Sequence, residues 1–518
     1  MRKLTRFLAL TAAWGVAATL GARLVAEDPK PTPPAAPAAT PATPAAEAPI
    51  NPIKVTSARI ETKTAVTPKP LSPAVKKAIE YLVKNQQDDG GWNQGGGWRT
   101  QVGGGGGRIE GANVEDPSDI GNTCFALLAL FRSGNTPVEG EHKEVVSKGL
   151  KFVLTKVEKA DKETLYVTDV RNTQLQSKIG PYVDTFLVNL VLAEMKGQAG
   201  SEEKRLVAAL EKTMNKIVKH QTAEGGFANN GGWAPTLSLA ICNKGLARAK
   251  QNGVEVDQKV FDRAFAQAKG AAAGTGTMSG VGGVGGPAPG FTGASKPGDS
   301  LALGRATSSP LAAAPARGMS GGLGGGGIGG GDAGVRLYSV GQGAGNSQDV
   351  VNSLRVDGKK AQEVLKDSKA TKEDKAKAEK TIEGLRKAEK ENGEVQRNLA
   401  ATVRDDRFVA GFGSNGGEEF LSFLNISEAL LVKGGKDWEE WDGKMTKGLE
   451  KAQDQNGSWS GHHCITGKTF CTAAALLVLT ADRTPFPVDV LKASATANEL
   501  KTEPKAEPKP ETPPPEKK

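Results

Sequence analysis

The sequence has few aromatic side chains, cysteines and histidines. Only 5% of its 518 residues are Phe, Trp or Tyr, and it contains four cysteines and four histidines. The net charge is +9, but basic and acidic residues alternate along most of the chain. A nucleic-acid-binding surface needs clustered basic residues with aromatic side chains for stacking, and no segment combines the two. We therefore expect no nucleic-acid partner.

Long apolar runs are also scarce. After the first 26 residues, no stretch approaches the roughly 20 apolar residues that a membrane-spanning helix requires. No Gly-x-x-x-x-Gly-Lys-Ser/Thr sequence occurs either, which excludes nucleotide binding through a P-loop.

The N-terminus is typical of an export signal. Three basic residues, Arg2, Lys3 and Arg6, lie within the first six positions. They precede an apolar run at residues 8–22 that is too short to span a membrane comfortably. Because no Ala-x-Ala cleavage site follows, an uncleaved anchor is the alternative to a cleaved signal. We expect residues 1–26 to direct export, so that the protein is periplasmic or secreted and contacts a membrane only through such an anchor.

Four segments have the composition of linkers or solvated arms. Residues 27–70 are rich in Pro and Ala and should form an extended spacer. Residues 270–346 are rich in Gly, and residues 486–518 in Pro, Lys and Glu. Such segments lack the apolar surface that offsets the entropy of ordering, so we expect disorder. Lys and Glu dominate residues 347–404, which predicts a solvated helical arm.

The remaining segments, 71–269 and 405–485, are predicted to be helical, with two kinds of helix in alternation. Amphipathic segments such as 73–84 carry apolar residues at i, i+4 and i+7 and charged residues on the opposite face. Other segments, such as 123–131 and 185–193, are apolar on nearly all sides, which is typical of buried helices.

The joints between the two kinds of helix repeat in the sequence. Each contains a Gln, a short polar run and then Gly-x-aromatic. The Gly can adopt the positive φ that ends a helix, and the Gln amide can bond backbone groups. The Gln and aromatic positions are Gln87 and Trp92, Gln221 and Phe227, and Gln453 and Trp459. Three recurrences at matching places predict stacked helical hairpins.

These joints resemble the QW repeats of the terpenoid cyclase and protein prenyltransferase superfamily. The resemblance implies an all-α protein with the αα-toroid fold, in which helical hairpins form two concentric rings and a ligand cavity opens at one end of the inner ring. It covers residues 71–269 and 405–485, where five hairpins can be counted. Members of the superfamily commonly have about six.

The catalytic motifs of the superfamily are missing. Cyclases that resemble squalene-hopene cyclase use an Asp-x-Asp-Asp motif, and the protein prenyltransferases bind zinc partly through Asp-x-Cys; neither sequence occurs here. Cyclisation also needs aromatic faces to stabilise cations. We therefore expect a ligand-binding cup or an interaction scaffold, with an apolar ligand or a protein as partner. The alternative is a cyclase-type or transferase-type enzyme acting on an isoprenoid or other apolar substrate, with Asp184, His463 and Cys464 as catalytic candidates.

The densest group of potential metal ligands is His462, His463 and Cys464, followed by Cys471. Nitrogen and sulfur ligands suit zinc, but a remote Asp would have to complete the site. A disulfide and a purely structural role are the alternatives, since exported proteins meet oxidising conditions. If the toroid closes, Cys124 and Cys471 lie on neighbouring helices. We predict no cofactor and keep zinc as an alternative.

Three acidic residues lie at the starts of predicted buried helices: Asp119, Asp184 and Glu418. Carboxylates at such positions commonly cap helices and compensate the helix dipole. In a toroid these helix ends share one opening, so the same three residues are candidates for the mouth of a pocket.

Overall fold

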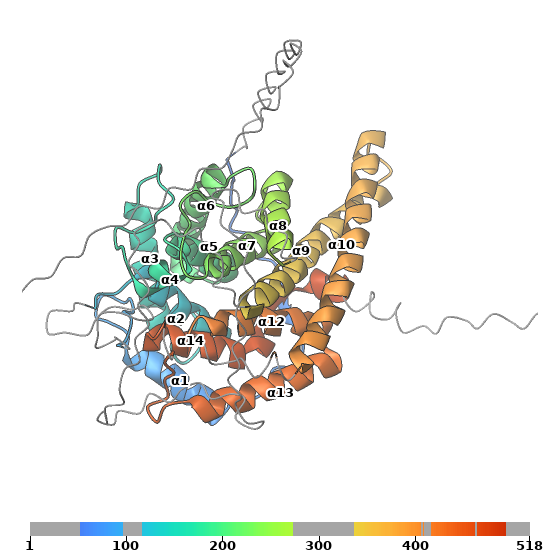
Figure 1. Cartoon of the computed structure of the whole chain (residues 1–518). Helices are drawn as coiled ribbons and strands as arrows, with labels where there is room; N and C mark the ends of the chain where they lie inside the picture. The colour runs from blue at the N-terminus through green and yellow to red at the C-terminus, as the bar shows by residue number, and fades with distance from the viewer. Residues whose placement is uncertain are drawn as a thin grey trace, which may run out of the picture. The chain divides into compact units, whose positions relative to one another are not determined.

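Helices make up nearly all the regular structure in the computed structural model of the chain (Figure 1). The structure describes residues 52–96, 116–272, 336–405, 408, 416–461 and 464–493. These residues belong to one compact unit, Ile50–Lys518. The all-α prediction is confirmed for them, whereas the predicted export signal lies outside the described residues.

Most of the described connections between elements are short, and the longer ones include residues 160–173 and 221–234. The helices are α1 (Pro73–Lys84), α2 (Ile120–Arg132), α3 (Lys143–Lys159), α4 (Gln174–Ile179), α5 (Val183–Met195), α6 (Glu203–His220), α7 (Pro235–Gln251), α8 (Gln258–Ala272), α9 (Arg336–Lys366), α10 (Lys372–Arg404), α12 (Glu419–Lys433), α13 (Gly435–Ala452) and α14 (Lys468–Leu479), with 3-10 turns η1 (Gly200–Glu202) and η2 (Ala481–Arg483). Two short strands, β1 (Thr62–Thr64) and β2 (Pro485–Pro487), pair antiparallel.

The two predicted kinds of helix are both present. Helices α2, α5, α7 and α12 are buried along almost their whole length, and so is α14 after its first residue. Helices α1, α3, α6 and α13 bury one face and leave charged residues in solvent. The apolar character of these five segments on nearly all sides therefore predicts correctly that they are buried.

Helix α9 is a sixth buried helix, and the sequence did not predict it. Its first half is buried, although much of it consists of Gly, Gln, Asn and Ser. The predicted C-terminal boundary of the disordered insert, residue 346, is therefore wrong, because α9 already begins at Arg336. The prediction of a solvated arm at 347–404 is confirmed for much of α10. It is wrong for the residues of this range that lie in the first half of α9, because they are buried.

Glycine allows α9 to approach α12 closely. A Cβ atom on Gly341 would lie 2.9 Å from the Cα of Ser422, and one on Gly345 would lie 3.1 Å from the Cβ of Asn425. Larger side chains at these positions would force the two helices apart. In α9, close packing of small and polar residues thus replaces the mainly apolar side chains of most of the other buried helices.

The six buried helices form a closed series of contacts. Helix α2 contacts α5, α5 contacts α7, α7 contacts α9, α9 contacts α12, and α12 contacts α14. Helix α14 in turn contacts α2. Each buried helix also contacts a more exposed neighbour: the pairs are α2 with α3, α5 with α6, α7 with α8, α9 with α10, α12 with α13, and α14 with α1.

The repeated joints use their Gln side chains to connect one exposed helix to the next. Gln453, just after α13, donates from Nε2 to Gly457 O at 2.9 Å and to Ala74 O in α1 at 2.8 Å. Gln221, just after α6, donates to Val260 O in α8 at 3.2 Å. The joint at Gln453 thus links the last exposed helix to the first.

At the first joint, the glutamine that bonds to the next exposed helix is Gln86, not the predicted Gln87. Gln86 Nε2 donates to Gly90 O at 2.8 Å and to Val145 O in α3 at 2.9 Å. Gln87 is exposed, and its side chain donates to Asn85 O, at 3.1 Å, rather than to the next exposed helix. The spacing from Gln to the turn glycine, which is the same at all three joints when Gln86 is chosen, could have identified the correct residue.

The joint tryptophans fasten each turn to the helix before it. Trp92 and Trp459 are almost completely buried, and each indole N–H donates to a backbone carbonyl, of Leu82 at 2.8 Å and of Leu449 at 2.9 Å. Phe227 takes the same place at the joint after α6 but has no N–H to donate. The repeated sequence therefore encodes a repeated local structure.

Gln86→Ala should lower the free energy of unfolding by about 1–2 kcal/mol, because two carbonyl groups lose their donor. Gln87→Ala, one position along, is the matched control and should leave stability nearly unchanged. Urea denaturation of both variants measures the difference. Equal losses in the two variants would contradict the assignment of Gln86 to the joint.

Candidate functional site

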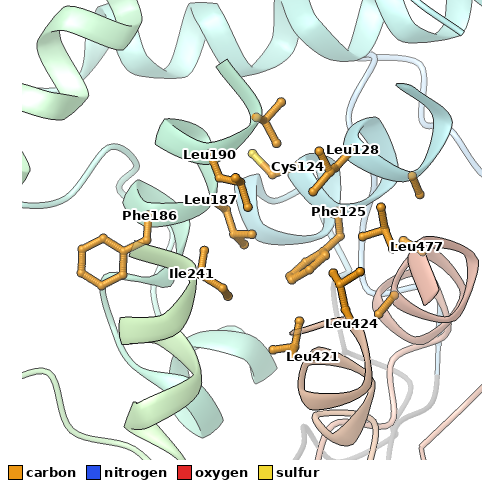
Figure 2. Packing of buried hydrophobic residues seen from close by; sticks show 14 of the residues in the cluster. Cys124, Phe125, Leu128, Phe186, Leu187, Leu190, Ile241, Leu421, Leu424 and Leu477 are labelled. Atoms are coloured by element: carbon orange, nitrogen blue, oxygen red, sulfur yellow. The ribbon is translucent and has the colours of Figure 1, made fainter. Parts of the chain in front are cut away.

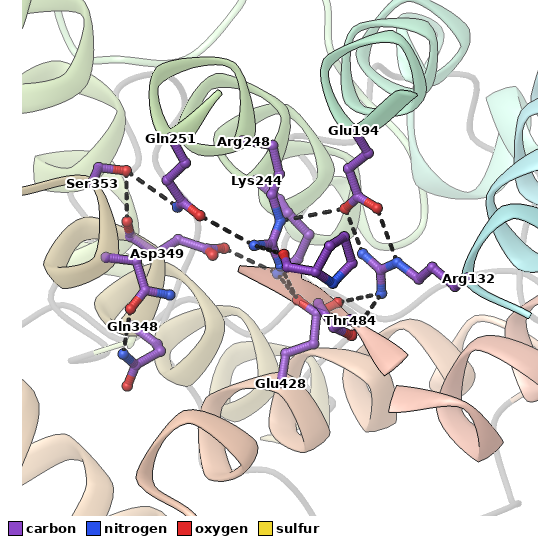
Figure 3. Close-up of polar contacts among 12 residues, drawn as sticks. Arg132, Glu194, Lys244, Arg248, Gln251, Gln348, Asp349, Ser353, Glu428 and Thr484 are labelled. Carbon is purple, nitrogen blue, oxygen red and sulfur yellow. Dashed lines mark hydrogen bonds and ion pairs between the residues drawn. The ribbon is translucent and has the colours of Figure 1, made fainter. Parts of the chain in front are cut away.

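The buried helices bring charged residues together at both of their ends. Their first residues meet at what we call the acidic end, which includes Asp119, Asp184 and Glu418. Residues further along these helices form what we call the ionic end, a cluster of six charged side chains: Arg132, Glu194, Lys244, Arg248, Asp349 and Glu428 (Figure 3).

The ionic end is centred on Arg132, the last residue of α2. Its guanidinium makes a bidentate pair with Glu194 of α5, with Nε to Oε2 at 3.0 Å and Nη2 to Oε1 at 2.6 Å. The remaining nitrogen, Nη1, donates to Glu428 Oε1 of α12 at 2.5 Å. One arginine thereby connects three buried helices.

Helices α7 and α9 join the same cluster. Lys244 Nζ lies 2.5 Å from Glu428 Oε2 and 3.0 Å from Asp349 Oδ2 of α9. Arg248 Nη2 lies 3.3 Å from Glu428 Oε2, and Arg248 Nε lies 3.3 Å from Glu194 Oε1. Three cations therefore face three carboxylates, and the cluster carries no net charge.

The electrostatics of the ionic end favour the charged forms of Arg132, Lys244 and Glu428. Burial alone would raise the pKa of Glu428, but Lys244, Arg132 and Arg248 together lower it well below its usual range. Buried charges of this kind are tolerated because they neutralise one another, and we assign none of these six residues to acid–base chemistry. Sequence reasoning missed this cluster, although charged residues inside apolar helices were the available signal.

At the acidic end, Asp119 and Asp184 lie on either side of Gly121. Asp119 caps α2, and its carboxylate accepts from Asn122 N and from Asn122 Nδ2, both at 2.8 Å. A Cβ atom on Gly121 would lie 2.9 Å from Asp184 Oδ1 and 3.5 Å from Asp119 Oδ1. The structure therefore brings these two predicted residues together at the start of α2 and α5.

Asp184 is the unusual group of this pair. Its Oδ2 accepts from Gln176 Nε2 at 2.6 Å, whereas its buried Oδ1 accepts no hydrogen bond from the described residues. Burial, reinforced by the charge of Asp119, raises the pKa of Asp184 to about 7. Burial also raises the pKa of the nearby Cys124 thiol, and the two carboxylates add to the effect. Asp184 thus exchanges its proton near neutral pH.

Glu418 belongs to a separate group of contacts at the same end. It accepts from Tyr338 Oη at 3.1 Å and from Ile465 N at 3.3 Å. Burial and the Glu418 carboxylate raise the pKa of Cys464 to about 12. Cys464 is therefore a thiol at neutral pH, which disfavours a role as nucleophile.

The metal and disulfide expectations can be examined only in part. His462 and His463 lie outside the described residues. Elsewhere in the described part of the chain, no three His, Cys, Asp or Glu residues are grouped as metal ligands. The disulfide alternative is wrong, because all four cysteines are free and buried. Cys124 and Cys471 do lie on contacting helices, α2 and α14, as expected.

Comparison with known proteins adds no relative. The chain matches no protein-family model, no curated protein and no solved structure. Within the described ranges, no helix has both the length and the apolar character needed to cross a membrane.

Proposed function

We propose that the chain is an exported αα-toroid that binds an apolar ligand bearing a hydrogen-bond donor, rather than an enzyme. The toroid is supported by the series of contacts that runs through six buried helices and returns from α14 to α2. It is also supported by the joint at Gln453, which connects α13 to α1. Export rests on the sequence of residues 1–26.

The inner surface of the cup would be apolar. Side chains from α2, α5, α7, α12 and α14 point toward one another in Figure 2, among them Phe125, Leu187, Ile241, Leu424 and Leu477. An apolar lining with few polar groups is typical of small-molecule sites. The ionic end would close one side of this lining, because its charged groups bind one another.

The observation that carries the binding function is the free acceptor at the opposite side. Asp184 Oδ1 is buried and accepts no hydrogen bond within the described residues. A ligand hydroxyl or ammonium group would supply the missing donor, and the apolar side chains would enclose the rest of the ligand.

One observation favours the enzymatic alternative. A carboxyl with a pKa of about 7, as burial gives Asp184, can donate or accept a proton near neutral pH. An acid of this kind could act on an isoprenoid held against the apolar lining. Of the other two catalytic candidates, Cys464 contacts the Glu418 group and His463 lies outside the described residues.

Native mass spectrometry with farnesol, an isoprenoid alcohol, tests the proposal. We expect one farnesol per chain with saturable binding. Leu424→Trp should weaken binding at least tenfold by filling the lining, whereas Val138→Trp, at an exposed position, is the matched control. An absence of saturable binding, or equal weakening by both variants, would refute the binding site. Conversion of farnesol to a product would instead establish the enzyme.

A further inference from the structure

The short helix α4 lies across the acidic end. It follows α3 in the chain and contacts both α5 and α7. Gln174, its first residue, reaches the segment before α14, where its Oε1 accepts from Thr466 N and Gly467 N, both at 3.0 Å. Gln174 Nε2 also donates to Thr466 Oγ1 at 3.0 Å.

The next residues of α4 cover two more helix starts. Leu175 packs over Gly121 at the start of α2, where a Cβ atom would lie 2.8 Å from Leu175 Cδ1. Gln176 donates to Asp184 at the start of α5. In this way α4 touches the first turns of α2 and α5 and the residue that precedes α14.

The far end of α4 is fixed to the start of α7. Lys178 O accepts from Ala234 N at 2.8 Å, directly before the first residue of α7. Hydrogen bonds therefore hold α4 to the starts of α5, α7 and α14, and the packing of Leu175 on Gly121 holds it to the start of α2. A helix of six residues is not stable alone, so these contacts determine where it lies.

Both ends of α4 have backbone geometry suited to a hinge. Asn172, just before it, has φ of 61°, and Gly180, just after it, has φ of 134°. A side chain on Gly180 would meet Ser238 Oγ at 2.9 Å, so glycine is needed there. These two turns mark off α4 as a discrete unit between α3 and α5.

The groups beneath α4 are those of the proposed binding site. Asp184 contacts α4 through Gln176, and Cys124 lies one helical turn after Gly121, on which Leu175 of α4 packs. Both side chains are buried. Access to Asp184 from solvent along this side thus requires α4 to move.

We infer that α4 is a lid over the ligand cup, and that its opening exposes Asp184 to a ligand carrying a hydroxyl or ammonium group. The inference rests on the proposed function for what the lid covers. The bonds of Gln174 to Thr466 and Gly467 are the latch, and the turns at Asn172 and Gly180 are the hinges.

Thiol labelling of the native full-length protein, with the labelled peptides identified by mass spectrometry, tests the lid. Cys124 lies one helical turn from Gly121, where α4 packs on α2, whereas Cys242 is buried within α7 and reports global opening. In Gln174→Ala, which removes the latch, Cys124 should react about tenfold faster than in the wild type, with Cys242 unchanged. Gln455→Ala, at an exposed glutamine, should change neither rate.

Hydrogen exchange of the wild type gives a second measurement that needs no variant. The amides of α4 should exchange much faster than those of α5. The lid is refuted if Cys124 and Cys242 respond equally to Gln174→Ala, or if α4 and α5 exchange at the same rate. Neither measurement uses a ligand. A failure to bind farnesol would therefore refute the proposed function without refuting the lid, and an immobile α4 would refute the lid without refuting ligand binding.

Discussion

Replacing Glu428 by glutamine is expected to lower the free energy of unfolding by about 3–5 kcal/mol. The amide keeps the size of the side chain but removes the charge that Arg132, Lys244 and Arg248 share. Three buried cations would then face two carboxylates, and an uncompensated buried charge is strongly destabilising. Urea denaturation at pH 7, followed by circular dichroism, measures the loss.

Glu440→Gln is the matched control for this prediction. Glu440 pairs with Arg404 at 2.9 Å on the exposed side of α13, where solvent screens the interaction. The same chemical change should therefore alter the free energy of unfolding very little at Glu440. If the two variants lost similar stability, the ionic end could not be the buried, mutually neutralising cluster described above.

The free energy of unfolding of the wild type is expected to fall as pH rises, because Asp184 ionises. The Asp184→Asn variant should lack this part of the fall. Burial, reinforced by Asp119, raises the pKa of Asp184 from 3.8 to about 7. A carboxyl with a higher pKa in the folded state binds its proton more tightly when folded. Wild-type stability therefore falls between about pH 4 and pH 7. The asparagine variant lacks this contribution, which amounts to as much as about 4 kcal/mol at pH 8.

Unfolding free energies measured from pH 4 to pH 8 test this difference. Burial also raises the pKa values of Glu418 and Asp482, so the informative quantity is the gap between the wild-type and variant curves. That gap should widen as pH rises and stay constant above pH 8. Asp169→Asn, at an exposed carboxylate, should give a curve parallel to the wild type. A parallel curve for Asp184→Asn as well would show that Asp184 is ionised in the folded protein at low pH.

The residues that sequence reasoning placed correctly have strong local signals. Apolar character on nearly all sides identified five of the six buried helices, and the Gly-x-aromatic pattern located the joints at Trp92 and Trp459. Asp119 and Asp184 were selected because they precede buried helices, and the structure brings both to Gly121. In each case, neighbours within one or two turns of chain determine the outcome.

The residues that were missed depend on partners far away in the chain. Helix α9 has no apolar stripe, and it is buried because Gly341 and Gly345 fit against α12. The bond from Gln86 to Val145 O in α3 likewise joins residues far apart in the chain, although the spacing from Gln86 to Gly90 was a local signal for this residue.

By itself, the sequence determined that the chain is built from alternating buried and exposed helices joined by repeated turns, because helical periodicity and turn chemistry are local. The tertiary structure decided how the buried charges are used. Arg132 and Glu428 are separated by nearly 300 residues, yet they form a 2.5 Å ion pair. Likewise, α4 covers Asp184 only because four helix starts meet beneath it. Both arrangements follow from long-range packing, which sets the distances between charges and therefore their protonation, and no local pattern in the sequence encodes those distances.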